Sequence, residues 1–251
     1  MANWSDPQFG ATPNSTTATG VAVDAGLRAH MLRVYNYMTS AILLTGIIAV
    51  LVGNTDLVYS LVSYNALTNH ISPSVLGWIV TLAPLGVVLW LSFGINRIST
   101  GLAQFLFWTY AVLLGASLST IFLVYTQASI ALTFFATAAS FASLSLYGYT
   151  TKRDLSGMGT FLMMGVVGLL VAMLVNMFWM NDTFSLVIAA IGVLVFAGLT
   201  AYDTQKIKSI YFQLQGSEFL GKAAIMGALN LYLDFINMFL FLLRFLGNSR
   251  N

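Results

Sequence analysis

The chain has 251 residues, of which 10 are Lys or Arg and 8 are Asp or Glu. Charged residues make up 7% of it and apolar residues 58%, whereas a soluble domain is about 25% charged, so we expect an all-α integral membrane protein in contact with the lipid bilayer. Its scattered cations exclude a nucleic-acid surface, and the absence of cysteine excludes disulfides, thiolate zinc sites and cysteine nucleophiles.

The N-terminal segment, residues 1–27, is predicted to be a disordered cytosolic tail. Up to Gly26 it is rich in Ala, Ser, Thr, Asn and Gly, and it contains no Lys or Arg and no apolar run of signal-peptide length. Residues 28–247 are expected to form the transmembrane domain, and residues 248–251 a short C-terminal tail.

Seven apolar stretches, each long enough to cross about 30 Å of hydrocarbon, follow one another along the chain. Only Thr126 and Gln127 separate the third stretch from the fourth, and only Asn181 and Asp182 separate the fifth from the sixth, so we expect each of these pairs to form an antiparallel hairpin. The predicted spans cover residues 34–52, 76–95, 102–125, 128–149, 160–180, 183–202 and 225–246.

Lys and Arg fall in alternate connections, which predicts the orientation of the bundle. The N-terminus is expected in the cytoplasm and, if all seven segments cross, the C-terminus outside together with Arg244 and Arg250. A re-entrant seventh segment would return both arginines to the cytoplasm, and this alternative stays open. The cations on the predicted cytoplasmic side are Arg28, Arg33, Arg97, Lys152, Arg153, Lys206, Lys208 and Lys222.

Small residues in the fifth and sixth spans are expected to let helices approach closely. No cofactor is expected, because the sequence has no glycine-rich phosphate loop and no Ser/His/Asp triad. His30 and His70 lie far apart and outside the spans, so we expect no histidine metal cage. The small residues are Gly165, Gly168, Gly192, Ala197, Gly198 and Ala201.

Two acidic residues, Asp203 and Asp234, fall at membrane depth, whereas the other six lie in tails or connections. A carboxylate at that depth costs on the order of 2.5 to 3.5 kcal/mol, and it usually faces the bundle interior and has a partner. Asn230, Asp234 and Asn237 are spaced by four and three residues, so they share one stripe of the last helix. The stripe predicts a central helix that lines a polar interior; the alternative is a set of interhelical hydrogen bonds.

Two carboxyl groups that meet in a weakly polar interior share one proton and titrate in two separated steps, so the pair would be a pH sensor. Without that proton they favour separation or a cation between them, and calcium, which takes carboxylate and carbonyl oxygens, is the natural divalent candidate. Two carboxylates are too few for a dedicated cage, so Asp203 and Asp234 predict a weak, transient calcium site. Helix rise allows them to pair if the last span begins near Gly227 after a loop.

Three segments resemble the Bax inhibitor-1 family, also called the transmembrane Bax-inhibitor-motif family, in its bacterial branch. Residues 231–247 are similar almost position by position to the last helix of that family, and they read Leu-Tyr-Leu-Asp-Phe-Ile-Asn-Met-Phe-Leu-Phe-Leu-Leu-Arg-Phe-Leu-Gly. Residues 202–208 read Tyr-Asp-Thr-Gln-Lys-Ile-Lys, and residues 152–156 read Lys-Arg-Asp-Leu-Ser. The resemblance extends over about residues 28–247.

The resemblance implies a seven-helix bundle with the last helix at its centre, in the bacterial inner membrane. It implies a pH-sensitive calcium leak channel gated by protonation of the Asp203 and Asp234 pair, with calcium as the permeant ion, and Asn230 and Asn237 are expected to support the pair. Arg97 matches an arginine of the family that serves as a latch by pairing with the aspartate of the sixth helix. The alternative is that Arg97 only helps to set the orientation of the chain in the membrane, as cytoplasmic cations do. With the proton shared, Arg97 would hold the second helix against the sixth and seventh; loss of the proton or of the arginine contact would admit calcium.

Other functional classes remain as alternatives. The chain could be a non-transporting regulator of a membrane protease or of another membrane partner, or a proton/cation antiporter. An intramembrane aspartyl protease is disfavoured because Asp234 does not follow Gly-x-Gly and no Pro-Ala-Leu comes after it. A retinal protein is disfavoured because the last span contains no lysine. We therefore expect no enzymatic activity.

Overall fold

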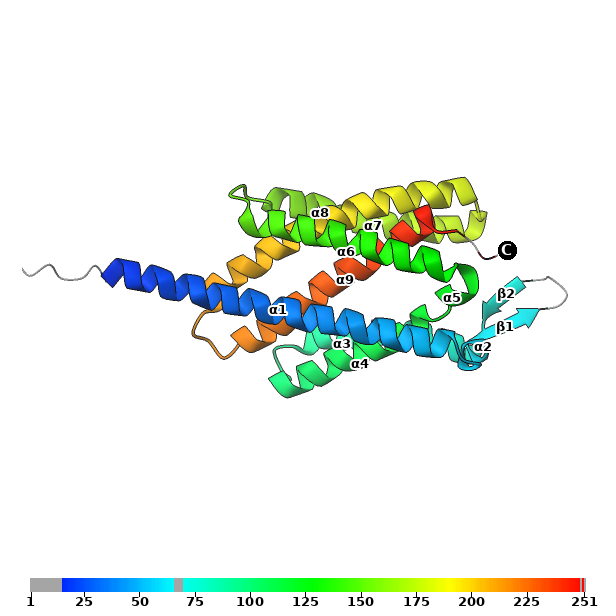
Figure 1. Ribbon diagram of the computed structural model, residues 1–251, viewed down its shortest axis with the longest axis horizontal. Helices are drawn as coiled ribbons and strands as arrows, with labels where there is room; N and C mark the ends of the chain where they lie inside the picture. Colours follow the sequence, from blue (N-terminus) through cyan, green and yellow to red (C-terminus); the bar gives the residue numbers. More distant parts are fainter. Residues whose placement is uncertain (1–14, 66–69, 249, 251) are drawn as a thin grey trace, which may run out of the picture.

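The computed structural model describes residues 15–65, 70–248 and 250. In this part of the chain, seven helical segments are long and apolar enough to cross a membrane, which confirms the predicted all-α membrane fold (Figure 1). The helices are α1 (Ser15–Gly53), α2 (Leu57–Ser60), α3 (Val75–Gly94), α4 (Thr100–Leu118), α5 (Ile121–Val124), α6 (Gln127–Thr150), α7 (Ser156–Trp179), α8 (Asp182–Leu214) and α9 (Leu220–Leu246).

The start of α1 differs from the prediction. The helix includes residues 15–27, which we expected to be disordered, and Leu27 is the first residue of its buried face. His30, expected ahead of the first span, is 4% exposed, and its ring centroid lies 5.5 Å from that of Tyr211 on α8. The remaining parts of the two predicted tails, residues 1–14, 249 and 251, lie outside the described residues.

A short β-hairpin between α2 and α3 was not predicted. Its strands are β1 (Val62–Asn65) and β2 (His70–Pro73), which pair antiparallel with Val62 opposite Pro73. Each strand has four residues, too few to show a clear alternation of apolar and polar positions in the sequence. The hairpin lies at the end of the bundle where α1 finishes (Figure 1).

The two predicted helical hairpins differ in outcome. α7 and α8 pack side by side as expected, and the turn between them is short because the Asn181 side chain caps α8 by accepting the Phe184 amide at 2.9 Å. The prediction for the third and fourth spans is wrong. The short helix α5 carries the chain across the end of the bundle, so that α4 packs on α1 and α3 while α6 packs on α8 and α9.

Helix α9 is the centre of the bundle, as predicted. It packs against α8, α1, α6 and α4, and Figure 1 shows it between a group formed by α6, α7 and α8 and a group formed by α1, α3 and α4. In its most apolar stretch 61% of the residues are buried, against 11% in α7. α9 is therefore solvated mainly by protein and α7 mainly by lipid.

The seventh segment runs through the whole bundle as one continuous helix, as a full crossing would require; the side of the membrane on which each terminus lies stays a prediction. α9 is continuous over Leu220–Leu246, and beyond it the Asn248 carbonyl accepts the Thr126 amide at 3.2 Å while the Arg250 amide donates to the Val124 carbonyl at 2.8 Å. This end lies opposite the start of α1 (Figure 1). Arg244, which departs from the alternating pattern of cations, forms an ion pair with Asp182 at 3.0 Å.

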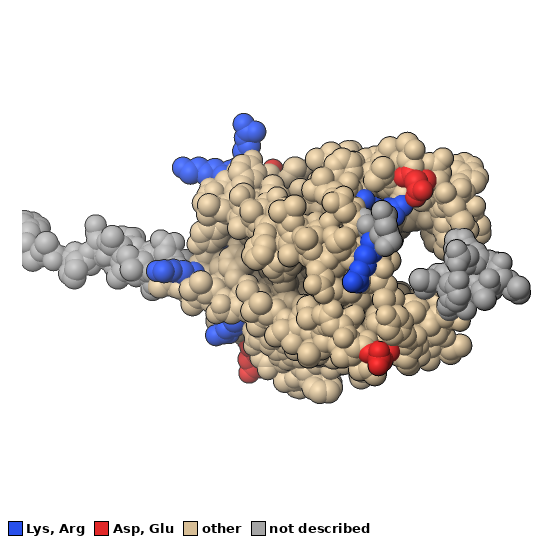
Figure 2. All heavy atoms as spheres, turned by 45° about the vertical axis from the view of Figure 1, so that its right-hand side comes forward, with Lys and Arg blue, Asp and Glu red and all other residues tan. Residues whose placement is uncertain are grey.

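The outer surface of the bundle is suited to lipid. Figure 2 shows several Lys and Arg side chains at the end where α1 begins and a few charged side chains toward the opposite end, with a largely uncharged surface between them. Large apolar side chains of α7 are strongly exposed, among them Phe161 at 74% and Phe178 at 78%. An uncharged apolar face of this kind marks a membrane contact.

Small residues bring helix backbones together, largely as expected. A Cβ atom added to Gly192 or Gly198 would meet the side chain of Phe241 or Leu162 within 3 Å, whereas one on Gly168 would meet nothing within 4 Å. A closer approach occurs at Gly148 of α6, outside the predicted set, where an added Cβ would lie 2.2 Å from the Ala201 carbonyl oxygen of α8. The α6–α8 contact therefore requires glycine at this position.

We expect Gly148→Ala to lower the free energy of unfolding by about 1–3 kcal/mol, because the added methyl group would overlap a backbone oxygen that cannot rotate away. Gly168→Ala is the matched control, since it adds the same methyl group in open space. Thermal unfolding of both variants in one detergent measures the difference. Equal midpoints would contradict the backbone contact of α6 with α8.

Candidate functional site

Asp234 lies in the middle of α9, the central helix. Its side chain is 4% exposed, and its neighbours Tyr232 and Phe235 are buried as well. The Asp234 Oδ2 atom has no hydrogen-bond partner among the described residues. A buried carboxyl group is costly unless it is protonated or paired. Asp234 is therefore a candidate site residue.

Asp203 of α8 is the partner of Asp234. The two carboxyl groups lie close enough to act on each other, so the structure brings together the two residues that the sequence paired. An ionised carboxylate has no proton to donate, so a hydrogen bond between two carboxyl groups requires that one of them be protonated. The two carboxyl groups could therefore hydrogen-bond to each other only while one of them carries a proton.

The length of α8 makes this pairing possible. A last span that begins near Gly227 after a loop was given as the condition for this pairing, and the structure does not meet that condition, because α9 begins at Leu220. Instead α8 continues well past its apolar run to Leu214. Asp203 lies 11 residues before the end of α8 and Asp234 14 residues after the start of α9, which leaves a mismatch in depth of only about 4.5 Å at the α-helical rise.

The pair offers a cation few ligands. Among the residues that the structure describes, no group of three or more His, Asp or Glu side chains could hold a metal ion. Calcium takes roughly six to eight oxygen ligands. Asp203 and Asp234 could therefore supply only part of the coordination shell of a passing ion, with water or carbonyl groups supplying the rest.

The other polar residues of the α9 stripe are only partly available to the pair. The Asn237 side-chain amide donates to the Leu233 carbonyl of its own helix at 2.9 Å. Asn230 is half-buried one turn before Asp234. The supporting role of Asn230 and Asn237 stays a prediction.

Arg97 does not contact the pair. It is exposed in the turn between α3 and α4, where its backbone amide donates to the Gly94 carbonyl at 2.8 Å. The lysine nearest to Asp203 in the sequence is Lys206, three residues further along α8. The latch role of Arg97 stays a prediction, and it requires α3 to move toward α8.

Gln205, two residues after Asp203, holds the connection between α6 and α7 in place. Its side-chain oxygen accepts the Leu155 amide at 2.8 Å, and its side-chain nitrogen donates to the Arg153 carbonyl at 2.7 Å. Two of the three segments that carry the family resemblance are thus in direct contact. Sequence reasoning quoted this glutamine but gave it no role, because only the fold brings the two segments together.

Asp154 in the same connection is a second acidic group near this end of α8. Hydrogen bonds from the Ser156 hydroxyl and amide hold the pKa of the Asp154 carboxyl below its ordinary value. Since that ordinary value is about 3.9, Asp154 stays ionised at neutral and mildly acidic pH. It therefore cannot act as a pH sensor in that range.

A chain of hydroxyl groups leads from the site to α1. The Thr204 hydroxyl lies 2.9 Å from that of Ser145 on α6, which lies 2.7 Å from that of Tyr35 on α1. Thr204 directly follows Asp203, so α1, α6 and α8 meet beside the acid pair. Sequence reasoning missed these residues because isolated hydroxyl groups in apolar spans give no signal until their helices are placed.

Known proteins resemble this chain along most of its length. A sequence model of the family described as inhibitor of apoptosis-promoting Bax1 matches residues 27–251. The chain is 46% identical over 237 residues to an uncharacterized protein, RP147, of Rickettsia prowazekii, covering 94% of this chain and 97% of the relative. It is 46% identical over 228 residues to the inner membrane protein YbhL of Escherichia coli, covering 90% and 94%. These matches confirm the resemblance inferred from three segments.

We expect Gln205→Leu to lower the free energy of unfolding by about 1–3 kcal/mol, because it leaves the Leu155 amide and the Arg153 carbonyl without their partner. Gln213→Leu is the control, since Gln213 is exposed on the same helix. Thermal unfolding in one detergent compares the two variants. A Gln205→Leu midpoint equal to that of the control would show that the clamp adds no stability.

Proposed function

We propose that this chain, which belongs to the Bax inhibitor-1 family, forms a passive calcium leak through the inner membrane, controlled by protonation of Asp203 and Asp234. The observation that supports the proposal is the proximity of these two carboxyl groups on neighbouring membrane-spanning helices. The name of the Escherichia coli relative, an inner membrane protein, supports the location. Membership of the Bax inhibitor-1 family is consistent with a calcium leak but does not by itself identify the activity.

The proposed control works through the shared proton. While one carboxyl group donates to the other, the contact joins α8 to α9 and the interior stays closed. Removal of the proton leaves two negative charges side by side in a weakly polar setting, where their repulsion is strong. The charges then separate or accept a cation between them, so the leak is expected to increase as the pH rises.

Calcium is proposed as the permeant ion for a chemical reason. It is a hard cation that accepts carboxylate, carbonyl and water oxygens with flexible geometry, and two carboxylates match its charge. Because the pair supplies only part of a coordination shell, the ion would be held weakly. Weak binding suits permeation, since the ion must leave the site as readily as it arrives.

Proteoliposomes loaded with a calcium dye test the proposal across about pH 5 to 8. We expect wild-type flux that depends on pH, and we expect Asp203→Asn or Asp234→Asn to abolish that dependence, because an amide cannot release a proton in this range. Asp56→Asn is the matched control, since Asp56 is exposed in the connection after α1, and it should keep the wild-type profile.

Three results would contradict this proposal in different ways. An Asp234→Asn variant with the wild-type pH profile would exclude the pair as the sensor. Calcium movement that requires an opposing proton gradient would indicate an antiporter. Absence of flux at every pH would favour a non-transporting regulator of a membrane protease or of another membrane partner.

The latch role of Arg97 is tested with the same assay. If Arg97 holds the second span closed, Arg97→Gln should raise calcium flux at the acidic end of the range, where the wild type is expected to be least active. Arg33→Gln removes an exposed cation from α1 at the same end of the bundle and should leave flux unchanged. Equal flux from both variants would leave Arg97 as an orientation anchor only.

A further inference from the structure

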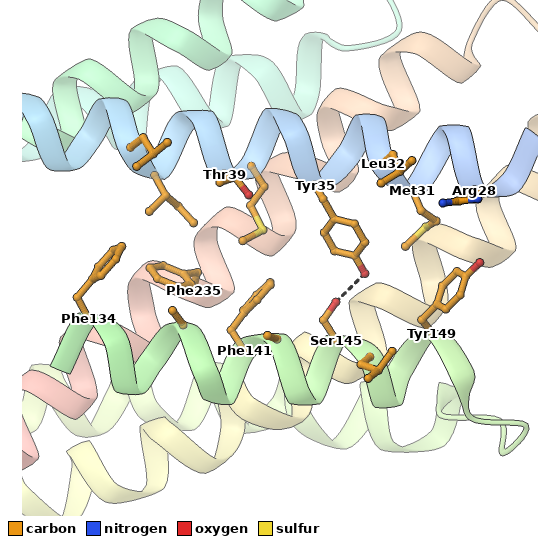
Figure 3. Close-up of a pocket in the computed structure, with 16 residues that line it drawn as sticks. Arg28, Met31, Leu32, Tyr35, Thr39, Phe134, Phe141, Ser145, Tyr149 and Phe235 are labelled. Atoms are coloured by element: carbon orange, nitrogen blue, oxygen red, sulfur yellow. Dashed lines mark hydrogen bonds between the residues drawn. The ribbon is translucent and has the colours of Figure 1, made fainter. Parts of the chain in front are cut away.

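We propose that the α1–α6 groove binds one phospholipid with an anionic headgroup, holding an acyl chain between the helices and the phosphate beside Arg28. The groove is a cavity of about 740 Å³ whose walls are α1 and α6 and whose floor includes Phe235 of α9 (Figure 3). Its volume falls within the range of roughly 300–1,000 Å³ that is typical of ligand sites.

The groove exists because α1 and α6 do not pack along their length. α1 packs on α4, α9 and α8, and α6 packs on α8 and α9, so the two helices face each other across α9. Figure 3 shows the side chains of both helices pointing into the space between them. Most of these side chains are apolar, including Met31, Phe134 and Phe141. The groove is therefore suited to hydrocarbon and unsuited to an ion path.

The groove opens toward the surrounding membrane. Leu32 and Leu43 on the α1 side are 50% and 57% exposed, and Leu146 on the α6 side is 63% exposed, although all three line the cavity. Both walls belong to membrane-spanning segments, so the solvent at this opening is lipid. A second cavity of about 430 Å³ shares Phe134 and Phe235 with the groove, so the apolar space continues toward the other end of the bundle.

One end of the groove is cationic. Arg28 of α1 and Tyr149 of α6 line that end (Figure 3). Behind Tyr149, the Lys208 Nζ atom donates to the Tyr149 carbonyl at 3.1 Å and lies 5.3 Å from the centre of its ring. Lys152 and Arg153 follow α6 at the same end. An apolar slot with cations at one end matches the order of acyl chain and phosphate in an anionic lipid.

The width of the groove favours an acyl chain over a helix of a protein partner. The Tyr35 side chain reaches from α1 to α6, where its hydroxyl lies 2.7 Å from that of Ser145 (Figure 3). A helix with side chains is roughly 10 Å across and could not enter without breaking this bridge. A single hydrocarbon chain is much narrower than a helix, so it can pass beside this bridge and leave it intact.

Photochemical labelling in proteoliposomes tests this site directly, independently of any calcium flux. The full chain is reconstituted with a trace of phosphatidylglycerol carrying a diazirine in its acyl chain, and the labelled peptides are identified after illumination. We expect the groove-lining residues of α1 and α6 to be labelled more strongly than the exposed face of α7. Phosphatidylcholine with the same chains should label the groove less.

Two variants with matched controls separate the parts of the site. Ala142→Trp places a bulky side chain in the groove and should remove most of its labelling, whereas Ala139→Trp, on the same helix but outside the groove lining, should not. Arg28→Gln should reduce labelling by phosphatidylglycerol about fivefold, the effect of losing one cation near an anionic lipid. Arg33→Gln should have little effect.

The proposal is overturned if the groove is labelled no more strongly than α7. Equal labelling by both lipids, with no effect of Arg28→Gln, would overturn the assignment of an anionic headgroup. An unlabelled groove beside a normally labelled α7 would mean that a protein partner or a second copy of the chain covers it. Arg28→Gln changes an exposed side chain and is expected to fold. It therefore still tests the lipid site if Ala142→Trp fails to fold.

Discussion

The arrangement of the bundle depends on one constraint: a carboxyl group inside a lipid-embedded protein needs a polar partner, because neither lipid nor apolar side chains can solvate it. Asp234 is buried on the central helix, and the carboxyl of Asp203 on α8 lies near it. Two carboxyl groups can hydrogen-bond to each other only while one of the two carries a proton, so a contact between this pair would be conditional. An amide or a lysine at position 203 would have made the contact permanent. In the proposed function, the choice of two acids is what would make the site sensitive to protons.

Two features of the helices bring the acids to nearly the same depth. α8 runs for 33 residues, roughly 50 Å at the α-helical rise, and so extends well past the hydrocarbon. α9 starts at Leu220, earlier than its apolar character indicates. The segment of α8 beyond Asp203 also carries Gln205 and Lys208, which bind the end of α6 and the connection to α7. The polar end of α8 thus fixes the helix while its apolar part crosses the membrane.

The sequence predicts the seven segments, the central position of the last helix and the two aspartates, because each of these follows from composition or helical spacing. It does not predict which helices touch. The connection of Thr126 and Gln127 suggested a packed hairpin, yet α9 lies between α4 and α6, and a two-residue turn carries no information about a helix 100 residues later. The predicted sixth span ends at residue 202, whereas α8 continues to Leu214, and the reason for this difference is another one. Hydropathy marks where a helix leaves the lipid, whereas hydrogen bonding decides where it stops.

One turn of α8 connects the acid pair with the α1–α6 groove. Successive residues of an α-helix point about 100° apart, so Asp203 can face α9 while Thr204 faces α6. Thr204 contacts Ser145, and Ser145 contacts Tyr35 in the wall of the groove. A shift of this turn that separates the acids would also move Thr204 against α6. The hydroxyl chain and the neighbouring carboxyl pair thus lie on adjacent residues of α8, next to Gln205, whose side chain holds the connection between α6 and α7.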